Sequence, residues 1–152
     1  MGANLSSNDS LPWSEDLIKR YVNKWDWNEN LSLSESLPWS ESLIDRYSDK
    51  WNWRNLSGNR SLPWNEALIE RYAERWDWDL LMINQSLPWS ENIITNYVDR
   101  WDWQLHNLSR AEQVIEKWDE QSICDFLDHT DSIAKELKAF RFPKSESFFS
   151  EW

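Results

Sequence analysis

The stretch SLPWSENIITNYVDRWDW, residues 86–103, carries three of the chain's 14 tryptophans. Near-copies of it recur along the chain, and a fixed period of this length indicates stacked structural repeats. Each copy follows the pattern Leu-Pro-Trp-(Ser/Asn)-Glu-x-(Leu/Ile)-Ile-x-x-Tyr-x-x-(Lys/Arg)-Trp-(Asp/Asn)-Trp. The copies begin at Leu11, Leu37, Leu62 and Leu87, with spacings of 26, 25 and 25 residues.

The pattern predicts where a helix begins in each copy. Proline disfavours helical geometry at the leucine before it, and the Ser or Asn after the tryptophan is a good N-cap. The glutamate that follows suits the positive end of a helix. With that cap, the first tryptophan falls at N′ and an isoleucine at N4, which is the hydrophobic-staple arrangement. The predicted staples are Trp13–Ile18, Trp39–Ile44, Trp64–Ile69 and Trp89–Ile94.

Apolar residues continue at helical spacing into a second tryptophan. In the first copy Leu17, Ile18, Tyr21 and Trp25 form one stripe, so we expect a long helix with this stripe in the core. An Asp or Asn then caps a shorter helix that begins at the third tryptophan. We therefore predict an all-α fold of two-helix repeats of about 25 residues, a short α-solenoid. The second tryptophans, expected in the core, are Trp25, Trp51, Trp76 and Trp101.

Neither end of the chain is a clean copy. Residues 1–10 align with the tail of a repeat and are either an N-terminal cap or part of a longer array. Residues 110–141 predict a degenerate fifth repeat and capping helices, which a stack needs at its end. Residues 142–152 form an aromatic tail. The four repeats between these ends span residues 11–36, 37–61, 62–86 and 87–109.

The motifs Leu-Pro-Trp-Ser and Trp-Asp-Trp resemble those of tryptophan-rich tandem-repeat proteins of bacteria and viruses. The resemblance covers residues 4–109, about two thirds of the chain. Those proteins are uncharacterised, so the resemblance implies a repeat architecture and carries no activity, cofactor or partner.

Composition narrows the class of function. A net charge of −11 argues against direct binding to nucleic acid or to an anionic membrane. With one cysteine, two histidines, no phosphate-binding glycine loop and no metal-ligand spacing, we expect no catalysis, cofactor or metal. The N-terminus fits no signal peptide, and no apolar run could span a membrane, so we expect a cytoplasmic location. Gly2 fits a myristoylation pattern, but no polybasic segment follows it.

The third tryptophan of each copy is the residue for which the sequence leaves two roles open. Its indole either bridges to the next repeat or joins an exposed ladder suited to binding. Positions that differ between copies on a constant helical frame are further contact candidates. The candidate partner-binding residues are Trp27, Trp53, Trp78, Trp103, Arg20, Arg46, Arg71 and Asn96.

The leading functional hypothesis is a non-catalytic protein-binding module, an inhibitor or adaptor that presents an extended helical surface. One alternative is an acidic inhibitor that imitates nucleic acid in the basic groove of a DNA- or RNA-processing or defence protein. Another is a tryptophan ladder that binds sugars or cations. Binding led by charge would weaken steeply with ionic strength, whereas aromatic burial would not.

Overall fold

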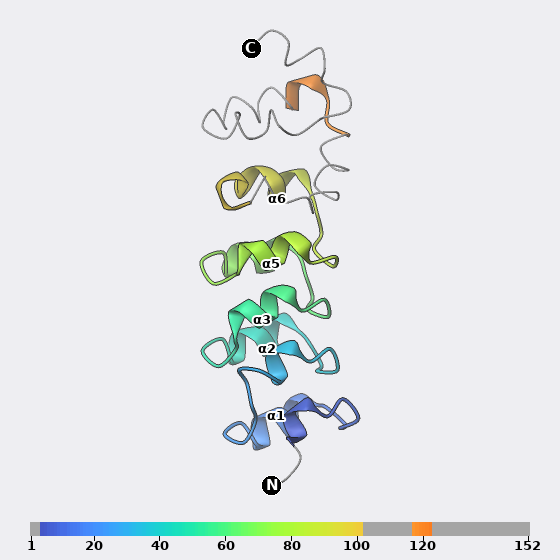
Figure 1. Ribbon diagram of the computed structural model, residues 1–152, viewed down its shortest axis with the longest axis vertical. Helices are drawn as coiled ribbons and strands as arrows, with labels where there is room; N and C mark the ends of the chain where they lie inside the picture. Colours follow the sequence, from blue (N-terminus) through green and yellow to red (C-terminus); the bar gives the residue numbers. More distant parts are fainter. Residues whose placement is uncertain (1–3, 102–116, 123–152) are drawn as a thin grey trace. The chain divides into compact units, whose positions relative to one another are not determined.

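The computed structural model describes residues 4–101 and 117–122 (Figure 1). Every regular element in these ranges is helical, which confirms the all-α class. The chain divides into two compact units, residues 1–88 and 89–152, each treated by itself below. Trp103, the aromatic tail, and most of the predicted fifth repeat and capping helices lie outside the described residues.

The described helices are short. Each α-helix has six residues, and single 3-10 turns (η) lie between some of them. The first unit contains η1 (Leu5–Ser7), α1 (Glu15–Arg20), η2 (Leu31–Leu33), α2 (Glu41–Arg46), α3 (Trp53–Gly58), α4 (Glu66–Arg71) and α5 (Trp78–Ile83). The described part of the second unit contains α6 (Glu91–Asn96) and η3 (Val98–Arg100).

The leading helix of each repeat begins as the sequence predicts. In the second repeat the backbone N–H of Trp39 donates to the Leu37 carbonyl at 2.8 Å, which closes a tight turn around the intervening proline. The Ser40 hydroxyl then accepts from the Leu43 N–H at 3.0 Å and caps α2. The equivalent caps, all observed, are Ser14, Asn65 and Ser90.

The leading helix ends earlier than predicted, because the second tryptophan caps it instead of extending it. α2 stops at Arg46, and Tyr47 already has non-helical backbone angles, φ −116° and ψ 28°. A turn brings Trp51 back, and its indole N–H donates to the Ile44 carbonyl at 3.2 Å. Carbonyls in the last turn have no partner within the helix, so this bond satisfies one of them. Trp25 and Trp76 do the same in the first and third repeats, and in the fourth the Trp101 indole donates to the Ile93 carbonyl, eight residues earlier.

The second helix follows the prediction in two repeats and departs from it in the first. α3 and α5 begin at the third tryptophan, and Asn52 and Asp77 cap them. The first repeat has one extra residue at this point, so the Leu31 N–H bonds to Asp26, five residues back, instead of four. The turn widens and only the 3-10 helix η2 follows. The prediction of a helix starting at Trp27 was therefore wrong.

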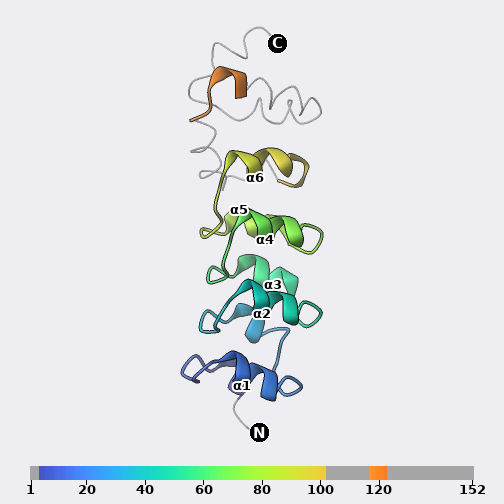
Figure 2. The same ribbon diagram turned by 180° about the vertical axis from the view of Figure 1, so that it is seen from behind.

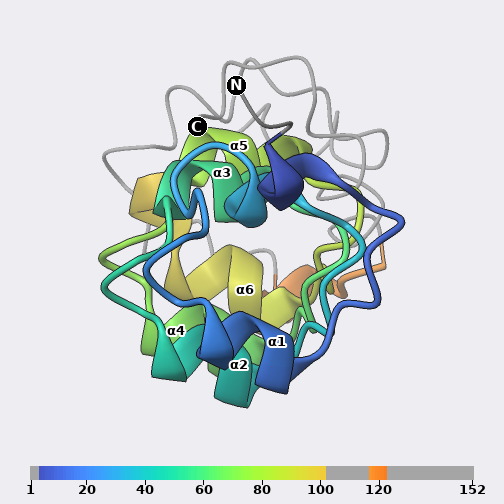
Figure 3. The same cartoon turned by 90° about the horizontal axis from the view of Figure 1, so that it is seen from below.

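The helices of the first unit form two layers. α1, α2 and α4 follow one another along one side (Figure 2), and α3 and α5 lie on the opposite side (Figure 3). Within the second layer, α3 contacts both η2 and α5. Aliphatic side chains from both layers are fully buried and form the core of the unit. They are Ile18, Leu31, Leu43, Ile44, Leu56, Leu68, Ile69 and Leu81.

A buried serine joins each repeat of the first unit to the next. The Ser32 hydroxyl donates to the Trp27 carbonyl at 2.6 Å and accepts from the Asn52 N–H at 2.9 Å. It therefore closes its own short turn and holds the start of the next short helix. Ser57 makes the equivalent pair of bonds to Trp53 and Asp77.

A buried asparagine makes a second polar link between repeats. The Asn59 side-chain nitrogen donates to the carbonyls of Ser32 and Ser34 at 3.1 and 3.0 Å, and its oxygen accepts from the Ser61 N–H at 2.9 Å. Asn84 makes the same link one repeat later. Because buried polar groups are costly unless they are paired, these bonds fix the register between repeats.

Candidate binding surfaces

Trp27, a candidate for an exposed ladder, is instead covered by the next repeat. It is 9% exposed, and its ring centroid lies 4.8 Å from that of Tyr47 and 4.7 Å from that of Trp51. The tilted and edge-on orientations are favourable ones for aromatic pairs. Of the two roles left open by the sequence, Trp27 takes the bridge. We call this arrangement an aromatic joint.

Trp53 forms the next aromatic joint. Its ring lies 4.5 Å from Tyr72 and 4.9 Å from Trp76, and the Arg75 guanidinium lies over it at 5.3 Å. The cation adds a favourable interaction with the ring face. Trp78, at the same position one repeat later, is half-buried. A ligand of a tryptophan ladder would stack on the ring faces, and at Trp27 and Trp53 rings of the next repeat already pack there.

The first tryptophan of each repeat packs against the second. Trp39 and Trp51 have their ring centroids 5.0 Å apart, and the predicted staple partner Ile44 is fully buried. Sequence reasoning missed this ring pair because the two tryptophans are twelve residues apart and only the turn after α2 brings them together. The same pairing occurs in Trp13–Trp25, Trp64–Trp76 and Trp89–Trp101.

The indole nitrogens of the first unit all bond to the protein itself. Each tryptophan from Trp13 to Trp78 donates its N–H to a backbone carbonyl five or seven residues earlier. Buried indoles normally find such a partner. The high tryptophan content of these repeats therefore serves helix ends, turns and aromatic joints.

Two of the candidate arginines tie one repeat to the next. Arg46 lies 3.3 Å from the Glu15 carboxylate. Arg71 pairs with Glu41 at 3.3 Å and with Asp45 at 2.8 Å. These carboxylates belong to the preceding repeat, so the arginine row of α2 and α4 is committed to contacts within the protein. Sequence reasoning missed the pairs because they span about 30 residues.

A tyrosine strengthens the contact between the second and third repeats. The Tyr72 hydroxyl donates to the Asp45 carboxylate. Burial, followed by this bond, raises the pKa of Tyr72 to about 12. The Tyr72 hydroxyl and then Arg71 lower the pKa of Asp45. Tyr72 is therefore protonated and Asp45 ionised at neutral pH, which suits a structural contact and not an acid–base catalyst.

Two exposed aliphatic side chains occupy equivalent positions on the second layer. Leu33 on η2 is 56% exposed and Ile83 on α5 is 47% exposed. The same position between them, on α3, is Gly58, which is also exposed. We call these three residues the aliphatic row. Sequence reasoning missed the row, although the residue at this position differs between the three copies: Leu33 and Gly58 follow Asn-Leu-Ser, and Ile83 follows Leu-Leu-Met.

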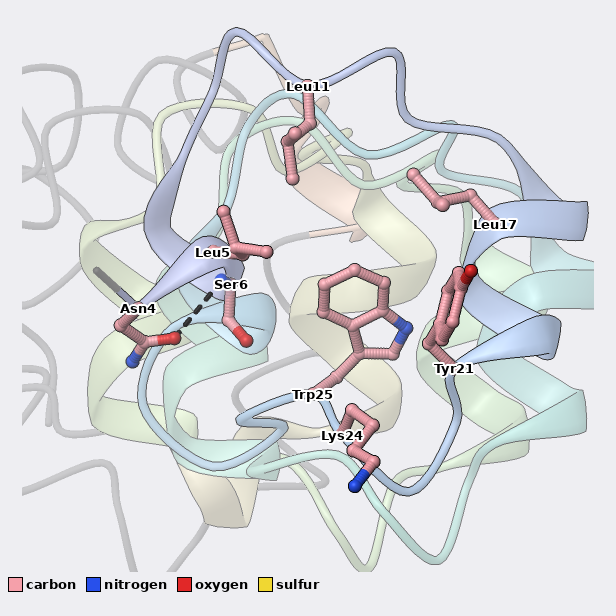
Figure 4. A pocket seen from close by; sticks show the side chains of 8 residues that line it. All are labelled: Asn4, Leu5, Ser6, Leu11, Leu17, Tyr21, Lys24 and Trp25. Atoms are coloured by element: carbon pink, nitrogen blue, oxygen red, sulfur yellow. Dashed lines mark hydrogen bonds between the residues drawn. The ribbon is translucent and has the colours of Figure 1, made fainter. Parts of the chain in front are cut away.

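Among the described residues, the tyrosine and second tryptophan of the first repeat lie beside a cavity. The cavity has a volume of about 640 Å³, and Figure 4 shows Trp25 and Tyr21 side by side within it. Tyr21 is 46% exposed, whereas its equivalent Tyr47 is 8% exposed. We call this the open aromatic face. Its lining residues are Asn4, Leu5, Ser6, Leu11, Leu17, Tyr21, Lys24 and Trp25.

Two further candidate residues are exposed. Arg20, which ends α1 and precedes Tyr21 in the chain, forms no ion pair within the part of the chain that the structure describes. Asn96 is exposed on α6 in the second unit. In the same described residues, no three His, Cys, Asp or Glu side chains gather as metal ligands. Nor does any helix there have the length and apolar character to cross a membrane.

Comparison with known proteins adds no relative. No protein-family model, curated protein or solved structure matches the chain.

Proposed function

We propose that this protein is a non-catalytic, solenoid-like module that binds another protein, with the aliphatic row at the centre of its binding surface. The supporting observation is the exposure of Leu33 and Ile83 at equivalent positions, next to repeated residues that are buried. Single exposed aliphatics are common, but apolar side chains aligned on one face are typical of interaction sites. Variation on a constant frame is how repeat proteins set their specificity.

The packing of the tryptophans weighs against a ladder that binds sugars or cations. A ligand would stack on the faces of the third tryptophans, and those of Trp27 and Trp53 are covered by Tyr47 and Tyr72. The ion pairs weigh against an imitation of nucleic acid. A protein that imitates nucleic acid would present carboxylates in place of phosphates, and one such carboxylate, that of Glu15, is already paired with an arginine. The single cysteine fits a reducing, cytoplasmic setting.

The test is affinity capture from an extract with matched variants. The double variant Leu33→Ser/Ile83→Ser removes the two exposed aliphatics and leaves the core intact. Ala67→Ser, at an exposed site on α4 in the other layer, is the control. Circular dichroism first checks that all three proteins fold. We expect a protein partner that survives high salt, is lost with the double variant and is retained by Ala67→Ser.

Two outcomes would contradict the proposal. A partner retained equally by the double variant would remove the aliphatic row from the interface. A basic, nucleic-acid-handling partner that leaves at moderate salt would favour the imitation of nucleic acid, because screening weakens contacts between exposed charges.

A further inference from the structure

We propose that the open aromatic face is a binding site for a tryptophan side chain supplied by a partner protein, in a segment of the Trp-(Asp/Asn)-Trp kind. None of the residues that line this site belongs to the aliphatic row, so the two proposals are tested separately. The two filled aromatic joints show what an equivalent pair of rings accepts in this fold.

The acceptor in each filled joint is a tyrosine and a tryptophan in edge-on contact. Tyr47 and Trp51 lie 6.4 Å apart at 85° and receive Trp27. In the third repeat, the equivalent pair lies 6.2 Å apart at 89° and receives the next indole, that of Trp53. In both joints the incoming ring contacts both members of the pair. The acceptor is therefore a recurring structure with a defined guest.

The same acceptor is already formed in the first repeat. Tyr21 and Trp25 lie 6.2 Å apart at 86°. The only other ring described against this pair is Trp13, which belongs to the same repeat. An acceptor held in the binding geometry before its guest arrives loses little entropy on binding, which raises affinity.

The sequence explains why the first repeat has no indole of its own to place there. Asn4-Leu5-Ser6 aligns with Asn55-Leu56-Ser57, and in that register Trp53 corresponds to Gly2. Glycine supplies no ring. The segment that would carry the guest thus keeps its polar links, since the Ser6 hydroxyl accepts from the Asp26 N–H at 2.9 Å, but lacks the indole.

The walls of the cavity match an indole. Leu5, Leu11 and Leu17 supply apolar contact around the ring pair (Figure 4). Lys24 lies at the position of Arg75, which covers the ring of Trp53, so its ammonium group can lie over a guest indole.

A charged residue next to Tyr21 in the chain adds a second requirement. Arg20 occupies the position at which Arg46 receives a carboxylate from the preceding repeat. Because Arg20 has no ion pair within the described residues, a partner with an acidic side chain near its tryptophan fits best. The recognised chemistry is therefore one indole with a neighbouring carboxylate.

The test uses the full chain, isotope-labelled for NMR, and a synthetic peptide with the sequence of residues 24–32, KWDWNENLS, in which Asp26 and Glu29 lie near the indole of Trp27. A second peptide carries Leu in place of Trp27. We expect the first peptide to shift the signals of residues 17–25, and the Leu peptide to bind about tenfold more weakly. Tyr21→Ala should weaken binding by a similar factor of about ten, in keeping with loss of an aromatic contact.

Two variants of residue 2 sharpen the test. Gly2→Trp restores the missing ring within the chain and should abolish peptide binding, whereas Gly2→Leu, the matched control, should reduce it less. The proposal would be overturned if both peptides bound equally, or if the peptide shifted NMR signals only of residues outside 17–25. Concentration-dependent shifts of residues 17–25 without peptide, abolished by Gly2→Trp, would also overturn it, in favour of a second copy of the chain as occupant. None of these variants changes Leu33 or Ile83, so a negative result at the open aromatic face does not bear on the aliphatic row.

Discussion

Replacing Asn59 by alanine removes one of the polar links between the second repeat and the first. Asn59 is 3% exposed and makes three hydrogen bonds through its side chain, at 3.1, 3.0 and 2.9 Å. A typical intramolecular hydrogen bond contributes about 1 kcal/mol net, so the three together contribute about 3 kcal/mol. Ser34 keeps a second donor, the Trp39 indole, whereas the buried Ser32 carbonyl loses the donor described above.

A loss of about 3 kcal/mol is large against the roughly 5–15 kcal/mol that separates most folded domains from the unfolded state. Urea unfolding followed by circular dichroism measures it as a lower midpoint at unchanged slope. Asn8→Ala is the matched control. Asn8 occupies the same turn position before the first repeat, but its side chain makes one exposed bond, to the Ser10 N–H at 2.9 Å. We expect that control to cost less than about 1 kcal/mol.

The comparison has a clear point of failure. If Asn59→Ala and Asn8→Ala lower the free energy of unfolding equally, the buried amide does not hold the repeats together. Asn84→Ala provides a second check, because its side chain makes the same links one repeat later. It should resemble Asn59→Ala and not Asn8→Ala.

Three further predictions concern single residues. Gly58→Ala should stabilise the protein by about 0.5–1 kcal/mol in urea unfolding, because Gly58 lacks a positive φ and an added Cβ meets no atom within 4 Å; a loss of stability would contradict this. Trp51→Phe keeps a ring but loses the N–H that caps α2, and should lower the melting temperature at a cost of about 1–3 kcal/mol. Folding raises the Tyr72 pKa from 10 to about 12, so its stabilising contribution is complete below pH 10 and lost as pH rises toward 12. Between pH 10 and 12 the free energy of unfolding should therefore fall less for Tyr72→Phe than for the natural chain. An equal fall in both proteins would refute the assignment.

The start of each leading helix was predictable because its causes are local. The proline turn and the Ser40 cap depend on residues no more than three positions apart. The end of the helix was not predictable in this way. Helical spacing continues through Tyr47 to Trp51, but the chain turns back because an indole N–H can satisfy a carbonyl seven residues earlier. A long-range hydrogen bond thus overrides the local periodicity.

Some features of the binding surfaces depend on packing between repeats, and one can be seen in the sequence. That Trp27 bridges and does not stand exposed depends on where the next repeat lies, which the sequence of one repeat does not contain. The ion pairs of Arg71 with carboxylates of the preceding repeat also depend on how the repeats pack. By contrast, the vacancy beside Tyr21 has a trace in the sequence, since the register of Asn4 with Asn55 puts Gly2 where a tryptophan belongs.

The buried asparagine links also bear on covalent modification. Asn59-Arg60-Ser61 and Asn84-Gln85-Ser86 both match the Asn-x-Ser acceptor signal for N-linked glycans. A glycan attaches to the side-chain nitrogen, and in Asn59 that atom already donates to two carbonyls of the preceding repeat. A sugar there would displace one of these bonds and would need solvent around a residue that is 3% exposed. The buried link made by Asn59 is therefore incompatible with glycosylation of that residue. A glycan added before folding would keep the two repeats apart.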